Sequence, residues 1–441
     1  MAEPTDRAWD TPHAGNPILP GYFADPSIIR NEGRWYIFAT IDPWGAERLG
    51  VWESGDFVDW TYHELNWPTK AAATSPASTS SMVWAPSVVK GRDGRFWMYV
   101  SVGSEIWVGV ADAPLGPWRN ALGDRPLVPG DYRPGFHMID AEAFIDDDGQ
   151  AYLYWGSGID WVNGHCFAVR LRPDMVSFDG EPVDVTPPYY FEAPFMVKQE
   201  GLYYLTYSNG KTTEDTYEVR YAVGDSPLGP FTEAANSPIL STDRARQIIS
   251  PGHHAIFRDG SAAYILYHRQ ALPFAVGGGD LRRQVSIDRL RFGRSGIETV
   301  QPTHEGERPG SARRAGRSLA FVPRASAGSA ATHGPERAAD DNYATLWRAA
   351  ARSGSGGGEW IEADLGRERE LEGSIIRPEF PGRAYNFQIR ISSDRRDWRV
   401  AAPLAEHQGS PIRIAHSVRA RYLRLEVEPG AGLFEWLVEG R

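Results

Sequence analysis

Residues 146–157, DDDGQAYLYWGS, decide the fold of this chain: a turn with aspartates and glycine leads into an aromatic-rich alternating strand. The same arrangement occurs five times. The other copies are NEGRWYIFAT at 31–40, GRDGRFWMYVSV at 91–102, KQEGLYYLTYS at 198–208 and FRDGSAAYILYHR at 257–269. Their glycines lie about 50–60 residues apart, the spacing expected for the blades of a propeller.

A second set of similar segments follows the first, with one segment after each of the first four copies. These segments are GVWESGDFVDW at 50–60, VGVADAPLGPWR at 108–119, FAVRLRPDMVSF at 167–178 and RYAVGDSPLGPF at 220–231. Two hairpins in each repeat give four strands, which is one propeller blade. We therefore expect residues 1–303 to form a five-bladed β-propeller.

The pattern changes after the repeats end. Residues 304–318, rich in Gly, Pro, Arg and Glu, predict a linker. From 319 to 441 the chain has short alternating strands without the blade period, which predicts a smaller, separate β-sandwich. No segment has the pattern of an amphipathic helix, so the predicted fold class is all-β.

Composition limits the classes of function. The net charge of −11 argues against a nucleic-acid or anionic-membrane partner, and no run of about 18 apolar residues predicts a membrane span. Sixteen Trp residues favour carbohydrate as the partner, because Trp rings stack on sugar rings. Cys166 is the only cysteine, so no internal disulfide is expected. The first 15 residues lack a signal-peptide pattern, which predicts a cytoplasmic protein, although a secreted protein whose signal had been removed would look the same. No protein partner can be inferred.

One polar or aromatic residue precedes the glycine of each repeat by roughly seven to ten positions. In a radial array, equivalent points of the blades face one axis, so these residues are expected to meet in one funnel. They are Asp25, Trp84, Asp140, Glu192 and His253. Taken singly, each has a structural alternative: Asp25 as a turn that starts a strand, Trp84 as a core side chain, and the others as hydrogen-bonding groups between blades.

Three carboxylates in one funnel suit glycoside hydrolysis. One acid protonates the leaving oxygen, a carboxylate across the sugar ring activates water or attacks, and a third tunes and orients the acid. The apolar neighbours of Glu192 should raise its pKa, as a proton donor requires. Trp84 is a candidate wall for a sugar ring, and His253 is a candidate for binding substrate or a metal-bound water. Arg283 is a candidate donor to sugar hydroxyls, although Arg282 is chemically equivalent to it.

The motifs NPILPGYFADPSIIR, MVWAPSVV, IDAEAFIDDDGQAYLYWGS, FEAPFMVKQEGLYYLTYS and PGHHAIF resemble those of glycoside hydrolase family 43 over about residues 15–303. The resemblance implies an inverting five-bladed enzyme with Asp25 as general base, Glu192 as general acid and Asp140 as the residue that modulates the acid. His253 matches the histidine of the family motif, and Arg283 is the arginine best aligned by its spacing to IDRL. No cofactor is implied, but a structural calcium ion is a candidate, held near His253 through water.

The stretches ERAADDNYATLW, WIEADLG, FQIRISSDRRDW and ARYLRLEV are similar to discoidin-like domains of the factor 5/8 type C class. This resemblance implies a jelly-roll carbohydrate-binding module. Asp340 is the candidate ligand for a calcium ion in this domain, although Asp341 stands where such domains commonly have glycine.

Together these features predict an inverting, exo-acting glycosidase that releases α-L-arabinofuranose from plant-type polysaccharide or oligosaccharide. A β-D-xylosidase or a galactofuranosidase on the same scaffold are the alternatives. An alternative of another class is a non-catalytic carbohydrate-binding propeller, which would have no need of a buried acid.

Overall fold

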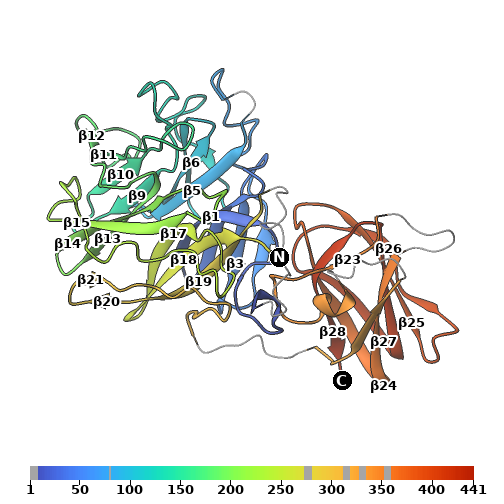
Figure 1. The fold of residues 1–441 in the computed structure, drawn as a ribbon. Coiled ribbons are helices and arrows are strands. Elements are labelled where there is room, and N and C mark those ends of the chain that lie inside the picture. The colour runs from blue at the N-terminus through green and yellow to red at the C-terminus, as the bar shows by residue number, and fades with distance from the viewer. Residues whose placement is uncertain (1–7, 79–80, 273–280, 311–317, 327–333, 352–358) are drawn as a thin grey trace. The chain divides into compact units, whose positions relative to one another are not determined.

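The structure is a computed structural model that describes residues 8–78, 81–272, 281–310, 318–326, 334–351 and 359–441 (Figure 1). Its strands confirm the all-β class. The helical segments that it describes are two single turns, η1 (Ala8–Asp10) and η4 (Pro335–Ala338). Over the described ranges, the chain has no helix with the length and apolar character needed to cross a membrane.

The chain divides into two compact units. The larger unit comprises Tyr22–Asp56 and His63–Pro309, and the smaller comprises Met1–Gly21, Phe57–Tyr62 and Gly310–Arg441. This division corrects two expected boundaries, and it also places Phe57–Tyr62, which lie within the expected propeller range, in the smaller unit. The described residues before Tyr22 belong to the smaller unit, and the larger unit continues beyond residue 303, because Nε2 of His304 lies 2.6 Å from the carbonyl oxygen of Arg246. Residues 311–317 of the predicted linker lie outside the described residues.

Five sheets follow one another along the chain as blades, which confirms the five-bladed propeller (Figure 1). Four sheets have four strands and the fifth has three. The first sheet is β1 (Phe23–Asn31), β2 (Arg34–Ile41), β3 (Gly50–Ser54) and β4 (Thr61–His63). The second is β5 (Val83–Lys90), β6 (Phe96–Val102), β7 (Ile106–Ala111) and β8 (Arg119–Asn120).

The remaining blades follow the same antiparallel order. The third is β9 (Glu142–Ile145), β10 (Ala151–Trp155), β11 (Phe167–Arg170) and β12 (Val183–Asp184). The fourth is β13 (Glu192–Gln199), β14 (Leu202–Asn209), β15 (Glu218–Gly224) and β16 (Thr232–Glu233). The fifth is β17 (Gly252–Asp259), β18 (Ala262–Gln270) and β19 (Arg283–Leu290), and a hairpin of β20 (Phe292–Gly293) and β21 (Gly296–Ile297) follows it.

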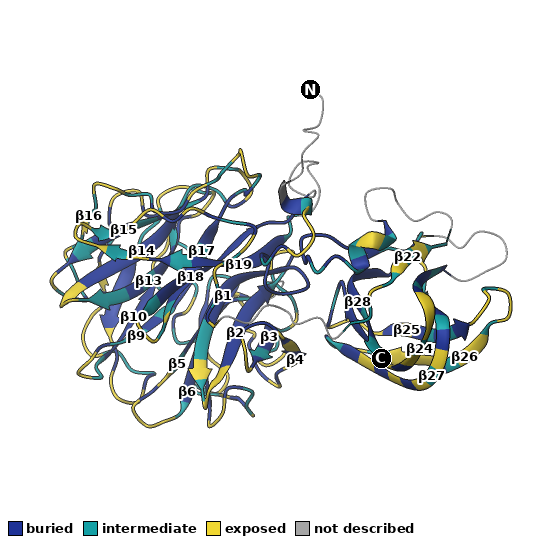
Figure 2. Cartoon of the chain, turned by 90° about the horizontal axis from the view of Figure 1, so that it is seen from below, coloured by how far each residue is buried: buried dark blue, intermediate teal, exposed yellow. Residues whose placement is uncertain are grey.

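The first strands of the blades surround the axis. Each of β1, β5, β9, β13 and β17 contacts the first strand of the next blade, and β17 contacts β1 to close the ring. Apolar cores lie between neighbouring blades, where for example Trp97 and Tyr99 of β6 pack with Trp155 of β10. Strands β6 and β7 are buried along their whole length. Buried residues also predominate along β2 (Figure 2).

A kink at the start of each first strand brings side chains to the axis. Four of the five first strands shift register there, as a β-bulge does, and bulges often re-aim side chains next to active sites. In every blade one residue at this point has a left-handed backbone conformation. These residues are Asp25 (φ 51°), Ala85 (φ 45°), Asp140 (φ 58°), Ala193 (φ 54°) and His253 (φ 40°).

These five kinked residues show that the residues expected to be equivalent in the five blades are not all equivalent. Asp25, Asp140 and His253 are equivalent, but their counterparts in the second and fourth blades are Ala85 and Ala193. Trp84 and Glu192 precede those alanines by one residue. The sequence did not reveal this difference because the distance from each kink to the following glycine varies between blades.

The smaller unit contains one sheet with the order β23-β28-β24-β27-β25-β26, to which β22 adds by pairing with β24. The strands are β22 (Val322–Ala325), β23 (Trp347–Arg348), β24 (Glu359–Pro378), β25 (Tyr385–Ser392), β26 (Arg399–His407), β27 (Ile412–Val427) and β28 (Gly432–Gly440). They enclose an apolar core around Trp347, Phe387 and Trp436. The N-terminal segment belongs to this unit because the side-chain amide of Asn342 donates to the carbonyls of Trp9 (2.9 Å) and Thr11 (3.1 Å).

Candidate active site

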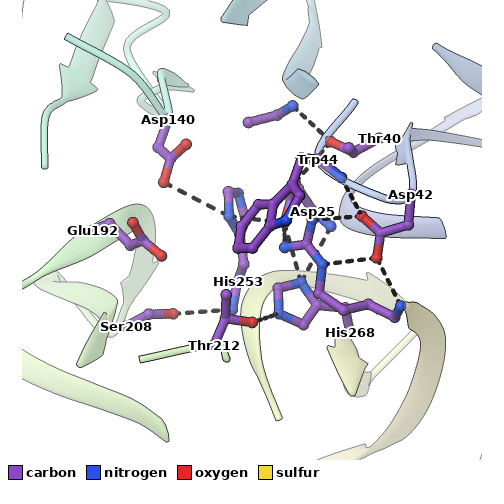
Figure 3. A network of polar contacts seen from close by, with 12 residues as sticks. Asp25, Thr40, Asp42, Trp44, Asp140, Glu192, Ser208, Thr212, His253 and His268 are labelled. Carbon is purple, nitrogen blue, oxygen red and sulfur yellow. Dashed lines mark hydrogen bonds and ion pairs between the residues drawn. The ribbon is translucent and has the colours of Figure 1, made fainter. Parts of the chain in front are cut away.

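One cavity of about 460 Å³ lies at the kinked ends of the first strands. All six residues that the sequence predicts for the propeller site line it: Asp25, Trp84, Asp140, Glu192, His253 and Arg283. Every blade contributes at least one of them. Figure 3 shows Asp140 and Glu192 on one side of Asp25 and His253, with Asp42 on the other side.

Asp25 is buried in β1, with 2% of its surface exposed, and its carboxylate is held by several donors. Oδ1 accepts a hydrogen bond from Nη1 of Arg283 (3.0 Å), and Oδ2 accepts one from the Thr40 hydroxyl (2.7 Å). Nδ1 of His253 and Nδ1 of His268 lie 3.2 and 3.1 Å from Oδ1. Burial alone would raise the pKa of Asp25, but Arg283 and the two histidines outweigh it and hold the pKa well below its ordinary value. Asp25 is therefore ionised at neutral pH.

Arg283 opens β19 and is fixed by a second carboxylate. Its Nη2 donates to Oδ1 of Asp42 (2.7 Å), while its Nε and backbone N–H donate to Oδ2 of Asp42 (2.9 and 2.7 Å). This fork aims the remaining guanidinium nitrogen at Asp25. The neighbouring Arg282 instead places its guanidinium 4.7 Å from the ring centre of Tyr22, so the structure separates two arginines that the sequence could not.

Glu192 opens β13 and faces two hydroxyl groups. Tyr217 donates to Oε1 (2.7 Å) and Ser157 donates to Oε2 (3.2 Å). Burial is the largest influence and raises the pKa of Glu192 to about 7; the bond from Tyr217 opposes this shift, whereas the charge of Asp25 adds to it. A carboxyl group with this pKa holds its proton in a substantial fraction of molecules at neutral pH, as a proton donor must.

Asp140 precedes β9 and is only 5% exposed. Burial, then the charges of Glu192 and Asp25, raise the pKa of Asp140 well above its ordinary value, whereas the N–H of Ala193 bonds to its carboxylate and opposes that shift. Two buried carboxyl groups that repel each other's charge titrate as a pair. Asp140 and Glu192 therefore retain a proton between them more readily than either would alone.

His253 lies in β17 between the two aspartates. Its Nδ1 is 3.2 Å from Oδ1 of Asp25 and 3.7 Å from Oδ2 of Asp140, and burial lowers its pKa. The adjacent His254 lies outside the cavity lining, where its Nε2 is 2.7 Å from the Thr206 hydroxyl.

Aromatic side chains form part of the cavity wall. The Trp84 ring lies 6.0 Å from the ring of His137, which also lines the cavity. Trp161 stacks on Phe191 (ring centres 5.6 Å apart) and lies 6.5 Å from Trp44, which is 42% exposed. Both Trp44 and Trp161 have left-handed backbones, with φ of 56° and 63°. Bulky residues seldom adopt this conformation, and such strain is common where ligands are held.

Sequence reasoning missed several residues of the site. It did not find Thr40, Asp42, Trp44, Ser157, Trp161, Tyr217 and His268. Most of them lie outside the kinked strand ends on which the sequence reasoning concentrated. Thr40 and His268 do follow a pattern, because each stands at the end of the second strand of its blade, where several blades have a polar residue.

The side chains near His253 do not by themselves form a metal centre. Among the described residues, no three His, Cys, Asp or Glu side chains are grouped so as to hold a metal ion. Nδ1 of His253 faces carboxylates, and Arg283 already supplies a cation to Asp25. The protein groups thus fit a calcium ion poorly, and no step of the chemistry is assigned to one.

Asp340 lies in the smaller unit, in a turn that its own side chain organises. Its carboxylate accepts hydrogen bonds from the hydroxyl of Thr345 (2.7 Å) and the N–H of Asn342 (3.2 Å), and its carbonyl accepts the N–H of His13 (2.7 Å). Burial raises the pKa of Asp340 to about 7. The protein itself occupies the oxygens that a calcium ion would need, so the donor set fits the predicted metal site poorly.

Comparison with known proteins agrees with this geometry. Residues 14–297 match the family profile described as Glycosyl hydrolases family 43, and residues 324–436 match the F5/8 type C domain. A solved structure described as a glycoside hydrolase superposes with a TM-score of 0.81 at 27% identity, covering 98% of this chain and 100% of that one.

Two curated relatives differ in the substrates that their names give. A beta-D-galactofuranosidase of Aspergillus niger is 36% identical over 312 residues, which cover 66% of this chain and 86% of that protein. An arabinoxylan arabinofuranohydrolase of Bacillus subtilis is 29% identical over 350 residues, covering 67% of this chain and 66% of that protein. With the family profile matched across the propeller and its buried acids gathered in one cavity, this chain belongs to glycosyl hydrolase family 43.

Proposed function

We propose that this chain is an inverting, exo-acting glycoside hydrolase that releases α-L-arabinofuranose from plant-type polysaccharide or oligosaccharide. The observation that carries the proposal is the division of charge among the buried acids. The pKa of Asp25 lies well below its ordinary value, whereas that of Glu192 is raised to about 7. An ionised base and a protonated acid in one cavity are the two groups that inverting hydrolysis requires.

In this mechanism each carboxyl group has one task. Asp25 accepts a proton from a water molecule as that water attacks the anomeric carbon. Glu192 donates its proton to the glycosidic oxygen as the bond to the leaving sugar breaks. Asp140 helps to keep that proton on the Asp140–Glu192 pair and, through its bond to the Ala193 N–H, orients the backbone beside the acid. Arg283 keeps Asp25 ionised, and Trp84 and His253 bind the sugar.

A β-D-galactofuranoside is the second candidate substrate, because the relative named for that activity is 36% identical to this chain. The rings of α-L-arabinofuranose and β-D-galactofuranose have the same configuration, and the hexose adds one CHOH group outside the ring. One active site can therefore accept both sugars if the cavity has room beside the exocyclic carbon.

A panel of aryl glycosides tests the substrate. Turnover of the α-L-arabinofuranoside above the β-D-galactofuranoside and the β-D-xylopyranoside is expected. Turnover of none of the three would favour the non-catalytic propeller instead. Proton NMR of the first-formed sugar tests the stereochemistry, and a product with retained configuration would contradict an inverting mechanism.

We also propose that the reaction requires no cofactor. Removal of metal ions with a chelator is therefore expected to leave turnover unchanged. If a structural calcium ion is present, its removal should change only the stability of the protein. We also propose carbohydrate binding by the F5/8 type C domain. A loss of affinity for polymer but not for aryl glycosides after that domain is altered would support this role.

A further inference from the structure

The kinked residues are joined from blade to blade by a ring of hydrogen bonds. At four of the five junctions, a side chain at the end of the second strand accepts the N–H of the kinked residue in the next blade. The pairs are Thr40 with Ala85 (2.8 Å), Ser101 with Asp140 (3.0 Å), Ser208 with His253 (2.9 Å) and His268 with Asp25 (3.3 Å). Each acceptor also pairs across its own sheet with the residue before that blade's kink, which shows that the positions are equivalent.

The junction between the fifth and the first blade differs from the others. Thr40, Ser101 and Ser208 carry a small hydroxyl group, which is enough to accept one N–H. His268 carries an imidazole ring that has no exposed surface. Accepting one N–H does not require a ring of this size, so its other contacts explain why a histidine stands there.

The ring of His268 contacts both the backbone nitrogen and the carboxylate of Asp25. Its Nδ1 lies 3.3 Å from the backbone nitrogen and 3.1 Å from carboxylate Oδ1 of Asp25. Its Nε2 lies 3.1 Å from the hydroxyl of Thr212, which lines the cavity. In either tautomer of the neutral ring, Nδ1 contacts Asp25 and Nε2 contacts Thr212 (Figure 3).

A third contact fixes the plane of the ring. The rings of His268 and Tyr217 are stacked with an angle of 1° and a centre-to-centre distance of 5.6 Å. The hydroxyl of Tyr217 in turn donates to Glu192. One stack therefore connects the side chain that holds Asp25 with the side chain that holds Glu192.

We propose that His268 is a positioning residue that fixes the Asp25 carboxylate for its reaction with water. The inference rests on the proposed function, in which Asp25 is the general base. A base must point at the attacking water, and a displacement of about 1 Å in such a group can lower a rate by roughly 10²-fold. Arg283 and Thr40 donate to the two oxygens of Asp25, and Nδ1 of His268 either accepts the Asp25 N–H or donates to Oδ1, depending on the tautomer of the ring.

Three substitutions of His268 test the contributions of its two ring nitrogens separately. His268→Asn leaves an amide group near the place of Nδ1, His268→Gln leaves one near the place of Nε2, and His268→Ala leaves neither. With an aryl arabinofuranoside, His268→Ala and His268→Gln should lower kcat by roughly 10²-fold, with KM changed by less than about threefold. His268→Asn should retain kcat within about tenfold of the wild type, because it still contacts Asp25.

Ser27→Ala is the matched control. The Ser27 hydroxyl accepts the N–H of Val88 (3.0 Å) between the first two blades, and Ser27 does not line the cavity. Its loss removes a buried bond between blades and should lower Tm by about 2–4 °C while kcat stays at the wild-type value. Two results would show that His268 only joins the blades and that the inference is wrong. In the first, Ser27→Ala slows turnover as much as His268→Ala does. In the second, His268→Ala lowers Tm without lowering kcat.

The same assay separates failure of the inference from failure of the proposed function. Asp25→Ala should abolish turnover if Asp25 is the base. An active Asp25→Ala variant would overturn the proposed function and this inference with it. An inactive Asp25→Ala variant combined with equal kcat losses in His268→Asn, His268→Gln and His268→Ala would overturn the inference alone.

Discussion

Replacing Tyr217 by Phe should move the alkaline limb of the pH–rate profile to higher pH. The Tyr217 hydroxyl donates to Oε1 of Glu192 at 2.7 Å, and a donor to a carboxylate stabilises its charged form. A hydrogen bond to a charged group contributes about 1.5–3 kcal/mol, and one pKa unit corresponds to about 1.36 kcal/mol. Removal of the hydroxyl should therefore raise the pKa of Glu192 from about 7 by roughly one to two units.

The assay is kcat/KM against pH with an aryl glycoside, because this parameter reports ionisation of the free enzyme. Activity requires protonated Glu192, so a higher pKa extends activity to higher pH. Tyr207→Phe is the matched control: this buried tyrosine donates to the carbonyl of Pro188 (2.7 Å) instead, and its loss should leave the limb in place. A limb that stays near pH 7 in Tyr217→Phe, or moves to lower pH, would refute Glu192 as the proton donor.

Three further substitutions test other parts of the site. Glu192→Gln should slow hydrolysis of alkyl or sugar leaving groups by roughly 10²–10⁴-fold but affect a dinitrophenyl leaving group far less, and equal losses on both would point to another acid. Arg283→Gln should move the acid limb of the profile to higher pH, because the pKa of Asp25 rises when the guanidinium is lost, and an unmoved acid limb would contradict that pairing. Trp161→Ala should raise KM for oligosaccharides by roughly two- to tenfold with kcat retained, since an aromatic stack contributes about 0.5–1.5 kcal/mol. An unchanged KM would exclude Trp161 from substrate binding.

The sequence predicts the propeller and its acids because both depend on short-range patterns. Glycine turns and alternating aromatics identify the blades, and radial symmetry then brings Asp25, Asp140 and Glu192 together although more than 160 residues separate the first from the last. The exact phase could not be predicted, since it depends on the left-handed kinks at Ala85 and Ala193. An alanine carries no mark of that backbone conformation in a single sequence.

Contacts between distant segments could not be predicted from the sequence either. His268 has the appearance of an ordinary polar residue at the end of a strand, and only closure of the ring places it beside Asp25. The sequence predicts that the N-terminal segment belongs to the propeller, because it precedes the first blade. Its hydrogen bonds to Asn342, more than 300 positions later, place it in the smaller unit instead.

The kinks at Ala85 and Ala193 have a consequence for redesign. The left-handed conformation costs a residue such as alanine roughly 1–2 kcal/mol, whereas asparagine and aspartate adopt it more readily. The backbone at these two positions already has the shape that presents Asp25 and Asp140 to the cavity. An asparagine at position 85 would therefore adopt this kink at a lower cost in backbone energy than the alanine does. The propeller offers five equivalent attachment points, and this enzyme places an ionisable side chain at three of them.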